Sequence, residues 1–430
     1  MNNFILGGGI AGLAAYNRLK KHGITANILE RNCTLGGLTR SIYVDRFVFD
    51  YTGHFLHLAS LKHPDELGLL STGKWKKISR KAFCYSHGVF IEAPFQYNLA
   101  KLPKSIRNEC LNSFLEVSSK PQKTVSKNYH LLDYFLDNFG SGITNHFLKP
   151  YNEKILATDL TSISASSINR FFPLPKKDLI EKGASLFNQT SVNLGYNSEF
   201  WYPEENGIQQ LINNMAHSHS CIPEEVKNID LEKRIITTNK SDYKYNNIFS
   251  SIPLDQVLRM SKHSTYQNNE TSLSYASVRT YQIGIRCKLP DDLKDKHWIY
   301  IADPTIPFHR VGIYSNFNHT MSPSDCYNLY VEVGIHCNTP QQTINIIDND
   351  VINSLENLGW VKKENIEILI SHTIEHGYVH FNHEWINVVP KHLSFLDNHN
   401  FHCIGRYGCW DYIGMEDGVI NAWNTVDKYN

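Results

Sequence analysis

The stretch Asn3-Phe-Ile-Leu-Gly7-Gly-Gly9-Ile-Ala-Gly12 decides the fold of the N-terminal part of this chain. Its first four residues are mostly apolar, as in a buried parallel strand, and residues 10–20 place apolar side chains at helical spacing. Residues 24–29 read as a second strand, which is followed directly by Glu30. Strand, glycine-rich turn, helix and strand in this order predict a Rossmann-like βαβ unit.

The spacing Gly7-x-Gly9-x-x-Gly12 is the fingerprint of dinucleotide binding when a strand precedes it and a helix follows it. Gly7 permits the tight turn, Gly9 lets the backbone approach a pyrophosphate, and Gly12 lets the helix pack against the strand. The helix N-terminus offers free N–H groups to phosphates, and Glu30 is placed to accept ribose hydroxyls. The alternative is a glycine-rich turn that only connects core elements.

The composition excludes some classes of function. The chain has 430 residues, about three domain-equivalents, with 42 basic and 42 acidic residues and hence no net charge. This balance argues against a nucleic-acid-binding protein, which needs a local excess of Lys and Arg. It leaves room for a small anionic ligand held by two or three arginines.

The cysteines and the apolar segments indicate where the protein is located. The nine cysteines are scattered without a C-x-x-C pair, which favours reduced thiols and a cytoplasmic protein. No apolar run reaches the ~18 residues of a membrane span, and the N-terminus lacks the basic start of a signal peptide.

The middle of the chain has a different texture. Apolar residues recur at helical spacing between Leu102 and Leu115 and between Leu131 and Phe139, which predicts a helical domain. Pro173 and Pro175 begin a polar stretch up to Ser198 that we interpret as a mobile loop. Between Ser277 and His380, β-branched and aromatic residues alternate, which predicts an antiparallel sheet.

Further motifs make the cofactor more specific. A second glycine pair, Gly36-Gly37, follows Glu30, and Phe49-Asp-Tyr-Thr-Gly-His54 comes next. Together they resemble the FAD-binding start of the amine-oxidase-like flavoprotein superfamily. Near the C-terminus, a helix predicted from about Gly418 directs its positive end toward a flavin. The predicted cofactor-binding residues are Gly7, Gly9, Gly12, Glu30, Arg31, Gly36, Gly37, Leu38, Gly405, Asp417 and Gly418.

Several segments, taken in order, resemble the UDP-galactopyranose mutase family, and its eukaryotic-type branch in particular. They are Pro94-Phe-Gln-Tyr-Asn-Leu99, Phe147-Leu-Lys-Pro-Tyr-Asn152, Trp298-Ile-Tyr300, Pro307-Phe-His-Arg310, His376-Gly-Tyr378 and Gly405-Arg-Tyr-Gly-Cys-Trp-Asp-Tyr412. The resemblance implies an α/β fold: a Rossmann-like FAD-binding domain with an inserted helical domain and an antiparallel β-sheet substrate domain. We expect residues 1–92, 191–265 and 393–430 in the FAD domain, 93–190 in the helical domain with its lid loop, and 266–392 in the substrate sheet.

The resemblance also implies an activity. In that family, N5 of reduced FAD attacks the anomeric carbon of a nucleoside-diphosphate sugar, so that pyranose and furanose forms interconvert without net redox change. The predicted catalytic residues are Arg310, Arg406, His54, Tyr300 and Tyr412; the predicted substrate-binding residues are Tyr378, Arg170, Asn152, Asn197, Trp298, Phe95 and Gln96. The arginines suit a diphosphate, because guanidinium makes bidentate contacts with phosphate oxygens.

Some positions depart from the family pattern. Ala93 and Leu156 stand where aromatic residues are usual, Met415 stands near an expected asparagine, and Thr52 replaces the first glycine of a Gly-Gly-His motif. We therefore expect UDP-galactopyranose or a related nucleoside-diphosphate hexose, deoxyhexose or heptose as substrate, in the biosynthesis of a cell-surface polysaccharide. NAD(P)H as reductant and a homo-oligomer are compatible with the sequence.

Two other classes of function stay open at this stage. An FAD oxidoreductase of the amine-oxidase or desaturase type would share the N-terminal fingerprint, and a non-catalytic nucleotide-sugar-binding flavoprotein is the third class. A metal site is not expected. The pattern His372-x-x-Glu375-His376 resembles a zinc-protease motif, but its flanks predict a strand, on which the two histidines lie about 13 Å apart.

Overall fold

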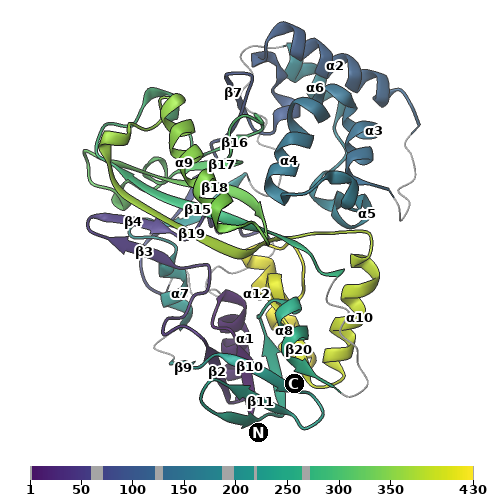
Figure 1. Cartoon of the computed structure of the whole chain (residues 1–430), viewed down its shortest axis with the longest axis vertical. Coiled ribbons are helices and arrows are strands. Elements are labelled where there is room, and N and C mark those ends of the chain that lie inside the picture. The colour runs from purple at the N-terminus through teal and green to yellow at the C-terminus, as the bar shows by residue number, and fades with distance from the viewer. Residues whose placement is uncertain are drawn as a thin grey trace.

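The computed structural model describes residues 2–59, 71–121, 129–185, 198–216, 220–263 and 272–429. Figure 1 shows three parts: a lower part that holds both termini, a group of helices at the upper right and a long twisted sheet at the upper left. Asn197 and residues 186–197 of the predicted lid lie outside the described residues.

The lower part is built on a five-stranded parallel sheet with the order β20-β13-β1-β2-β9. Its strands are β1 (Asn3–Leu6), β2 (Ala26–Glu30), β9 (Ile222–Pro223), β13 (Asn247–Ser250) and β20 (Phe401–Cys403). They come from three distant stretches of chain, because parallel neighbours need long crossover connections. Helices α1 (Ile10–Lys21) and α12 (Met415–Lys428) pack against each other in this part (Figure 1), and the predicted Rossmann-like unit is confirmed.

Smaller elements surround this sheet. A four-stranded sheet combines β10 (Val226–Asp230), β11 (Ile235–Thr238), β12 (Asp242–Lys244) and β14 (Ser261–Lys262). The hairpin of β3 (Ser41–Val44) and β4 (Phe47–Asp50) and the pair of β5 (Trp75–Ser79) and β8 (Glu199–Pro203) lie toward the upper sheet. The remaining helices are α7 (Gln209–Ala216), α8 (Leu254–Met260), α10 (Trp385–Asp397) and α11 (Gly405–Gly408).

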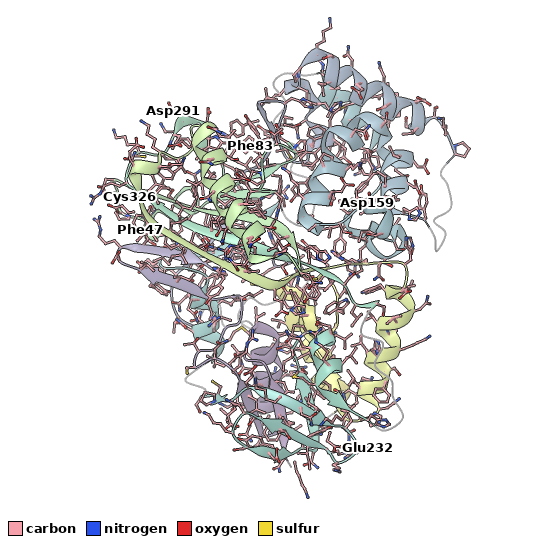
Figure 2. The ribbon with its side chains drawn as sticks, in the orientation of Figure 1. Phe47, Phe83, Asp159, Glu232, Asp291 and Cys326 are labelled. Atoms are coloured by element: carbon pink, nitrogen blue, oxygen red, sulfur yellow. The ribbon has the colours of Figure 1, made fainter. Side chains whose placement is uncertain are left out.

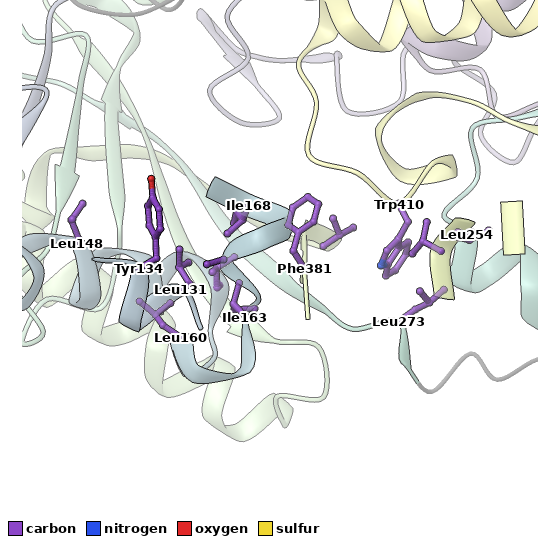
Figure 3. Close-up of a cluster of buried hydrophobic side chains, with 14 of the residues drawn as sticks. Leu131, Tyr134, Leu148, Leu160, Ile163, Ile168, Leu254, Leu273, Phe381 and Trp410 are labelled. Atoms are coloured by element: carbon purple, nitrogen blue, oxygen red, sulfur yellow. The ribbon is translucent and has the colours of Figure 1, made fainter. Parts of the chain in front are cut away.

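The helical part contains α2 (Lys104–Ser118), α3 (Leu131–Ile143), α4 (Lys149–Leu156), α5 (Ala165–Ile168) and α6 (Lys177–Ser185). Helix α6 lies within the stretch that we interpreted as a loop, because Ile180 and Ala184 are buried and stabilise it. Figure 3 shows how Leu131, Ile163 and Ile168 of this part pack in the same cluster of buried side chains as Phe381 and Trp410. The helical part is therefore joined to the rest of the chain by a shared hydrophobic core.

The upper sheet has seven strands in the order β19-β15-β18-β17-β16-β6-β7. They are β6 (Ala82–Ser86), β7 (Val89–Glu92), β15 (Tyr275–Ile285), β16 (Trp298–Ile301), β17 (Arg310–Ile313), β18 (Tyr327–His336) and β19 (Ile366–Val379). Residues 82–92 therefore belong to this sheet and not to the first part of the Rossmann-like domain. The strands of residues 266–392 pair in antiparallel fashion, as expected, and β6 joins them in parallel beside β16.

Helix α9 (Gln341–Asn357) covers one face of the upper sheet, and Arg279 of β15 pairs with Asp348 of the helix at 2.7 Å. The opposite face is lined by aromatic side chains and meets the β3–β4 hairpin, where Phe47 lies (Figure 2). All nine cysteines are unpaired. In the part of the chain that the structure describes, no helix is long and apolar enough to cross a membrane.

Asp50 connects three elements beneath the loop that leads to His54. Its carboxylate is 1% exposed and accepts hydrogen bonds from Tyr202 (2.5 Å), Ser41 (2.7 Å) and the backbone N–H of Ile208 (3.0 Å). Burial raises the pKa of Asp50 to about 6, although these hydrogen bonds oppose the shift.

The raised pKa of Asp50 predicts that the stability of the fold depends on pH. A carboxyl whose pKa rises from 3.8 to about 6 on folding stabilises the fold below pH 4, and this contribution is lost as the pH rises through 6. Relative to Asp50→Asn, the wild type should lose about 3 kcal/mol of unfolding free energy across that range. Urea unfolding between pH 4 and pH 7 measures the difference. Asp242→Asn, at an exposed aspartate, is the control, and parallel pH curves for wild type and Asp50→Asn would contradict the prediction.

Candidate active site

The glycine-rich turn after β1 forms a cradle at the start of α1. Gly7 has a φ of +91°, and a Cβ on Gly12 would lie 2.0 Å from the carbonyl oxygen of Gly7, so both positions require glycine. Helix α1 begins after Gly9 with no side chain capping its N-terminus and no acidic residue in its first turn. Its first N–H groups therefore remain available for an anion.

The second glycine pair closes the cradle from the other side. Gly36 donates its backbone N–H to the carbonyl oxygen of Gly8 at 2.8 Å, and Gly9 and Gly36 form an isolated parallel bridge. A Cβ on Gly37 would lie 3.2 Å from the Cα of Gly9, so the two backbones approach closely only because side chains are absent. The structure brings the two predicted glycine motifs together around one site.

Glu30 lies at the end of β2 beside this turn and is 8% exposed. Its two carboxylate oxygens accept hydrogen bonds from the backbone N–H groups of Gly8 (2.8 Å) and Asn32 (2.9 Å). Oε1 also accepts from the side-chain amide of Asn32 at 3.1 Å, so Oε2 is the oxygen that keeps a lone pair with which to accept a ribose hydroxyl. Arg31 is exposed next to it, and Leu38 is half-buried.

The C-terminal helix differs from its prediction. Helix α12 begins at Met415, not near Gly418, and Asp417 accepts a hydrogen bond from the backbone N–H of Gly414 at 3.1 Å. Two acidic residues, Glu416 and Asp417, occupy its first turn and offset its positive end. Gly418 is nevertheless buried beside open space, since a Cβ there would meet no atom within 4 Å.

A row of polar side chains crosses the upper sheet on one face. Tyr300 of β16 lies opposite Arg310 of β17, and Arg310 lies opposite Glu332 of β18. Residues directly opposite each other on neighbouring strands share a face, so the pairing places the three side chains side by side. Two of them were predicted site residues, and Glu332 was not.

Glu332 is bound on every side. Arg310 contacts it in a bidentate manner, with Nε to Oε2 and Nη2 to Oε1 both at 2.7 Å, and Nε2 of His309 lies 3.4 Å from Oε2. Glu332 is 1% exposed; burial would raise its pKa, but Arg310 and His309 lower it to about 2. The positive charge of Arg310 is thus neutralised within the protein. The sequence signal for Glu332 was its acidic side chain within the otherwise apolar strand Tyr330-Val-Glu-Val.

Arg406, unlike Arg310, is not paired with any carboxylate of the described residues. Its guanidinium donates to the carbonyl oxygens of Gly377 (2.9 Å) and Ile413 (3.5 Å), and its buried Nε has no hydrogen-bond partner. Its Cζ lies 4.3 Å from the ring centroid of Tyr412 and 5.5 Å from that of Tyr378. Among the described residues, no carboxylate lies within 4.0 Å of this guanidinium. Arg406 is therefore a cation without a counter-charge, as an anion-binding site requires.

His54 is electrostatically linked to both arginines. Burial lowers the pKa of His54 to about 4; Glu332 opposes this shift, and the charges of Arg406 and Arg310 add to it. The imidazole is therefore neutral near pH 7, and its buried Nδ1 has no hydrogen-bond partner. The unpaired nitrogens of His54 and Arg406 leave room for further hydrogen bonds.

A row of aromatic rings runs from the helical part to the upper sheet. Phe95 stacks on Phe147 (4.6 Å), Phe147 stacks on Tyr151 (5.4 Å), and Tyr151 meets Tyr300 edge-on (5.4 Å). Tyr378 and Tyr412 lie 5.7 Å apart on the side of Arg406. Phe95 is 1% exposed and Phe147 7%, so both belong to the core, and the predicted substrate-binding Phe95 supports the site from within it.

Other predicted residues lie at the edge of the site or in the core. Arg170 is 47% exposed and pairs with Asp411, next to Tyr412. Trp298 is 3% exposed and stacks on Phe55 at 4.5 Å, so it supports the core of the sheet. Asn152 is buried and donates to the carbonyl oxygen of Leu148 at 2.6 Å. Gln96 is half-buried.

The zinc-like motif lies on β19, as its flanks predicted. His376 pairs with Asp255 at 2.9 Å, and His372 contacts the hydroxyl of Thr280 at 3.0 Å. Within the described ranges, no group of three or more His, Cys, Asp or Glu residues is arranged to hold a metal ion. The two histidines serve separate structural contacts.

The cradle and the parallel sheet beneath it form a Rossmann-like domain, a class of domain that binds dinucleotides. A family model described as an NAD(P)-binding Rossmann-like domain matches residues 5–64. The crystal structure of reduced UDP-galactopyranose mutase matches 100% of this chain and 95% of its own, with a TM-score of 0.91 and 23% identity. The chain therefore has the fold of UDP-galactopyranose mutase, as the sequence resemblance implied.

Other solved structures share this fold more distantly. A fatty acid isomerase from P. acnes matches with a TM-score of 0.67 and 14% identity, covering 99% of this chain and 98% of its own. Cyclohexylamine oxidase from Brevibacterium oxydans matches with a TM-score of 0.65 and 12% identity, with the same coverage. Isomerases and oxidases thus occur on one fold, and the site must distinguish between them.

Proposed function

We propose that this protein is an FAD-dependent mutase that interconverts the pyranose and furanose forms of a nucleoside-diphosphate sugar. The observation that carries the proposal is Arg406, a guanidinium without a counter-charge that tyrosine rings surround and that is electrostatically linked to His54. An oxidase acting on a simple amine has no need of such an anion site, whereas a diphosphate leaving group requires one.

The residues of the cradle suit FAD. The uncapped start of α1 and the close approach of Gly9 to Gly37 suit a pyrophosphate, and Glu30 suits a ribose. The unpaired Nδ1 of His54 needs a partner that a flavin ring edge can supply. These residues would hold FAD, and the chemistry that reduced FAD would supply there is a nucleophile for the anomeric carbon.

The protein side chains do the remaining work. Arg406 holds the diphosphate and stabilises the charge that develops on it when its bond to the sugar breaks. Tyr378 and Tyr412, whose rings flank Arg406, are placed to donate their hydroxyls to the phosphate oxygens. Arg310, at the start of β17, is held in a fixed direction by Glu332. Because His54 is neutral, it adds no positive charge on the cofactor side of the site.

The proposed substrate class is UDP-galactopyranose or a related nucleoside-diphosphate hexose, deoxyhexose or heptose, used in making a cell-surface polysaccharide in the cytoplasm. At two positions where the family usually has aromatic residues, this chain has Leu156 and Ala93. Leu156 is 5% exposed within the main core, and Ala93 is half-buried against the same cluster. We infer a smaller contact surface for the base or sugar, because neither position carries an aromatic ring.

The test is a product assay with the FAD-loaded protein. We expect the dithionite-reduced holoprotein to convert a UDP-furanose sugar into its pyranose, detected by chromatography, and the oxidised holoprotein to be inactive. NAD(P)H in place of dithionite tests the proposed physiological reductant. Net oxidation of a substrate with oxygen consumption, and no isomer formed from any nucleoside-diphosphate sugar, would refute the mutase.

A further inference from the structure

The loop before His54 contacts the upper sheet at several points, one of which is the side chain of Thr52. The hydroxyl of Thr52 donates a hydrogen bond to Oε1 of Glu332, and the backbone N–H of Gly53 lies 3.4 Å from the same oxygen. The loop itself is tight, since the backbone N–H of His54 donates to the carbonyl oxygen of Thr52 at 2.8 Å. Residues from two parts of the fold therefore share one buried carboxylate.

That carboxylate is also the partner of Arg310. Oε1 accepts from Nη2 of Arg310 at 2.7 Å as well as from Thr52, and Oε2 accepts from Nε of Arg310 at 2.7 Å. Oε1 therefore accepts from the guanidinium and from the Thr52 hydroxyl, and the backbone N–H of Gly53 reaches the same oxygen at 3.4 Å. The direction of the Thr52 hydrogen bond thus limits the orientations of Glu332, and Glu332 limits those of Arg310.

The loop that carries His54 packs tightly against the upper sheet. Tyr330 is wholly buried, and its ring or hydroxyl would lie 2.3 Å from a Cβ on Gly53 and 1.8 Å from a Cβ on Gly312. The ring of Tyr330 also lies 5.7 Å from Cζ of Arg310. A shift of the loop that carries His54 must therefore move Tyr330 or Glu332 and, with them, Arg310.

We propose that Thr52 is a positioning residue that couples the loop carrying His54 to the guanidinium of Arg310 through Glu332. The inference rests on the proposed function in one respect, namely that a diphosphate is the ligand of the arginines. A glycine at this position would remove the hydroxyl that donates to Oε1 and leave the backbone N–H of Gly53 as the loop's remaining donor to Glu332. The hydroxyl of Thr52 makes the cofactor side and the diphosphate side of the site respond to each other.

The first test measures UDP binding to the oxidised holoprotein by titration calorimetry. We expect Thr52→Val, which keeps the shape and removes the hydroxyl, to raise the Kd for UDP about five- to tenfold. Thr52→Ser, which restores the hydroxyl, should stay within about twofold of wild type. Thr161→Val is the matched control, because the hydroxyl of Thr161 also donates to a carboxylate, that of Asp159, but in the exposed helical part (Figure 2).

A double-mutant cycle tests the route of the coupling. In an Arg310→Lys background the bidentate contact is lost, so Thr52→Val should then change the Kd for UDP by less than about twofold. Equal losses in both backgrounds, or no loss from Thr52→Val in the wild type, would overturn the proposal.

A readout that needs no nucleotide separates this inference from the proposed function. We expect Thr52→Val to shift the visible absorption spectrum of bound FAD, because the loop carries His54, and Thr52→Ser to leave the spectrum unchanged. If the wild type binds no UDP, the proposed function fails, and the spectra alone decide the role of Thr52. Identical spectra for wild type and Thr52→Val would then overturn the coupling as well.

Discussion

Arg406→Ala should lower kcat/KM for the nucleoside-diphosphate sugar by about 10²- to 10⁴-fold while the folded protein stays about as stable as the wild type. The activity falls because Arg406 is the cation at the site that has no counter-charge. Among the described residues, no neighbouring carboxylate loses an ion pair in this variant. Stability is retained because removal of Arg406 leaves only the carbonyl oxygens of Gly377 and Ile413 short of a donor. We expect a change in unfolding free energy within about 1 kcal/mol.

Steady-state kinetics and urea unfolding of the same preparation check both halves of this expectation. Arg406→Lys should recover part of the activity, since it keeps the charge and loses the planar fork. Arg286→Ala is the control: Arg286 is 60% exposed and pairs with Glu367, so its loss should leave turnover unchanged. A turnover of Arg406→Ala within tenfold of the wild type would remove the basis for placing the diphosphate here.

Arg310→Ala should lose both activity and stability. Its partner Glu332 is 1% exposed, and loss of the guanidinium leaves a buried carboxylate without its counter-charge. Removing one member of a buried ion pair costs about 3–5 kcal/mol of unfolding free energy. We therefore expect a large fall in Tm for this variant and not for Arg406→Ala.

A second substitution separates the two effects. In Arg310→Ala/Glu332→Gln the buried charge is gone, so stability should recover by about 2 kcal/mol or more, whereas turnover should remain low. Thermal unfolding and kinetics of the single and double variants measure this. Equal Tm values for Arg310→Ala and the wild type would show that Glu332 does not depend on Arg310 in the folded state.

The parts of the site that were predictable follow from local backbone geometry. Gly7, Gly9 and Gly12 could be assigned because a tight turn and a close helix–strand approach need glycine at those spacings, and the structure confirms the cradle. The start of α12 was placed too late, because the N-cap is Gly414, which has no side chain, and the one capping side chain is that of Asp417 within the helix. Trp298 and Tyr300 share one strand, and only packing shows that Trp298 stacks against Phe55 in the core.

The sequence by itself determined the glycine-rich turn, because a tight turn and a close helix–strand approach depend on residues close together in the chain, and its ordered motifs singled out the two arginines. Only the tertiary structure decided that Arg310 is neutralised and Arg406 is not, and that Thr52 meets Glu332. Thr52 and Glu332 are 280 residues apart, and their contact depends on how the Rossmann-like domain docks against the upper sheet. Charge neutralisation is decided by distances of a few ångströms between such segments, which is why only the folded chain reveals it.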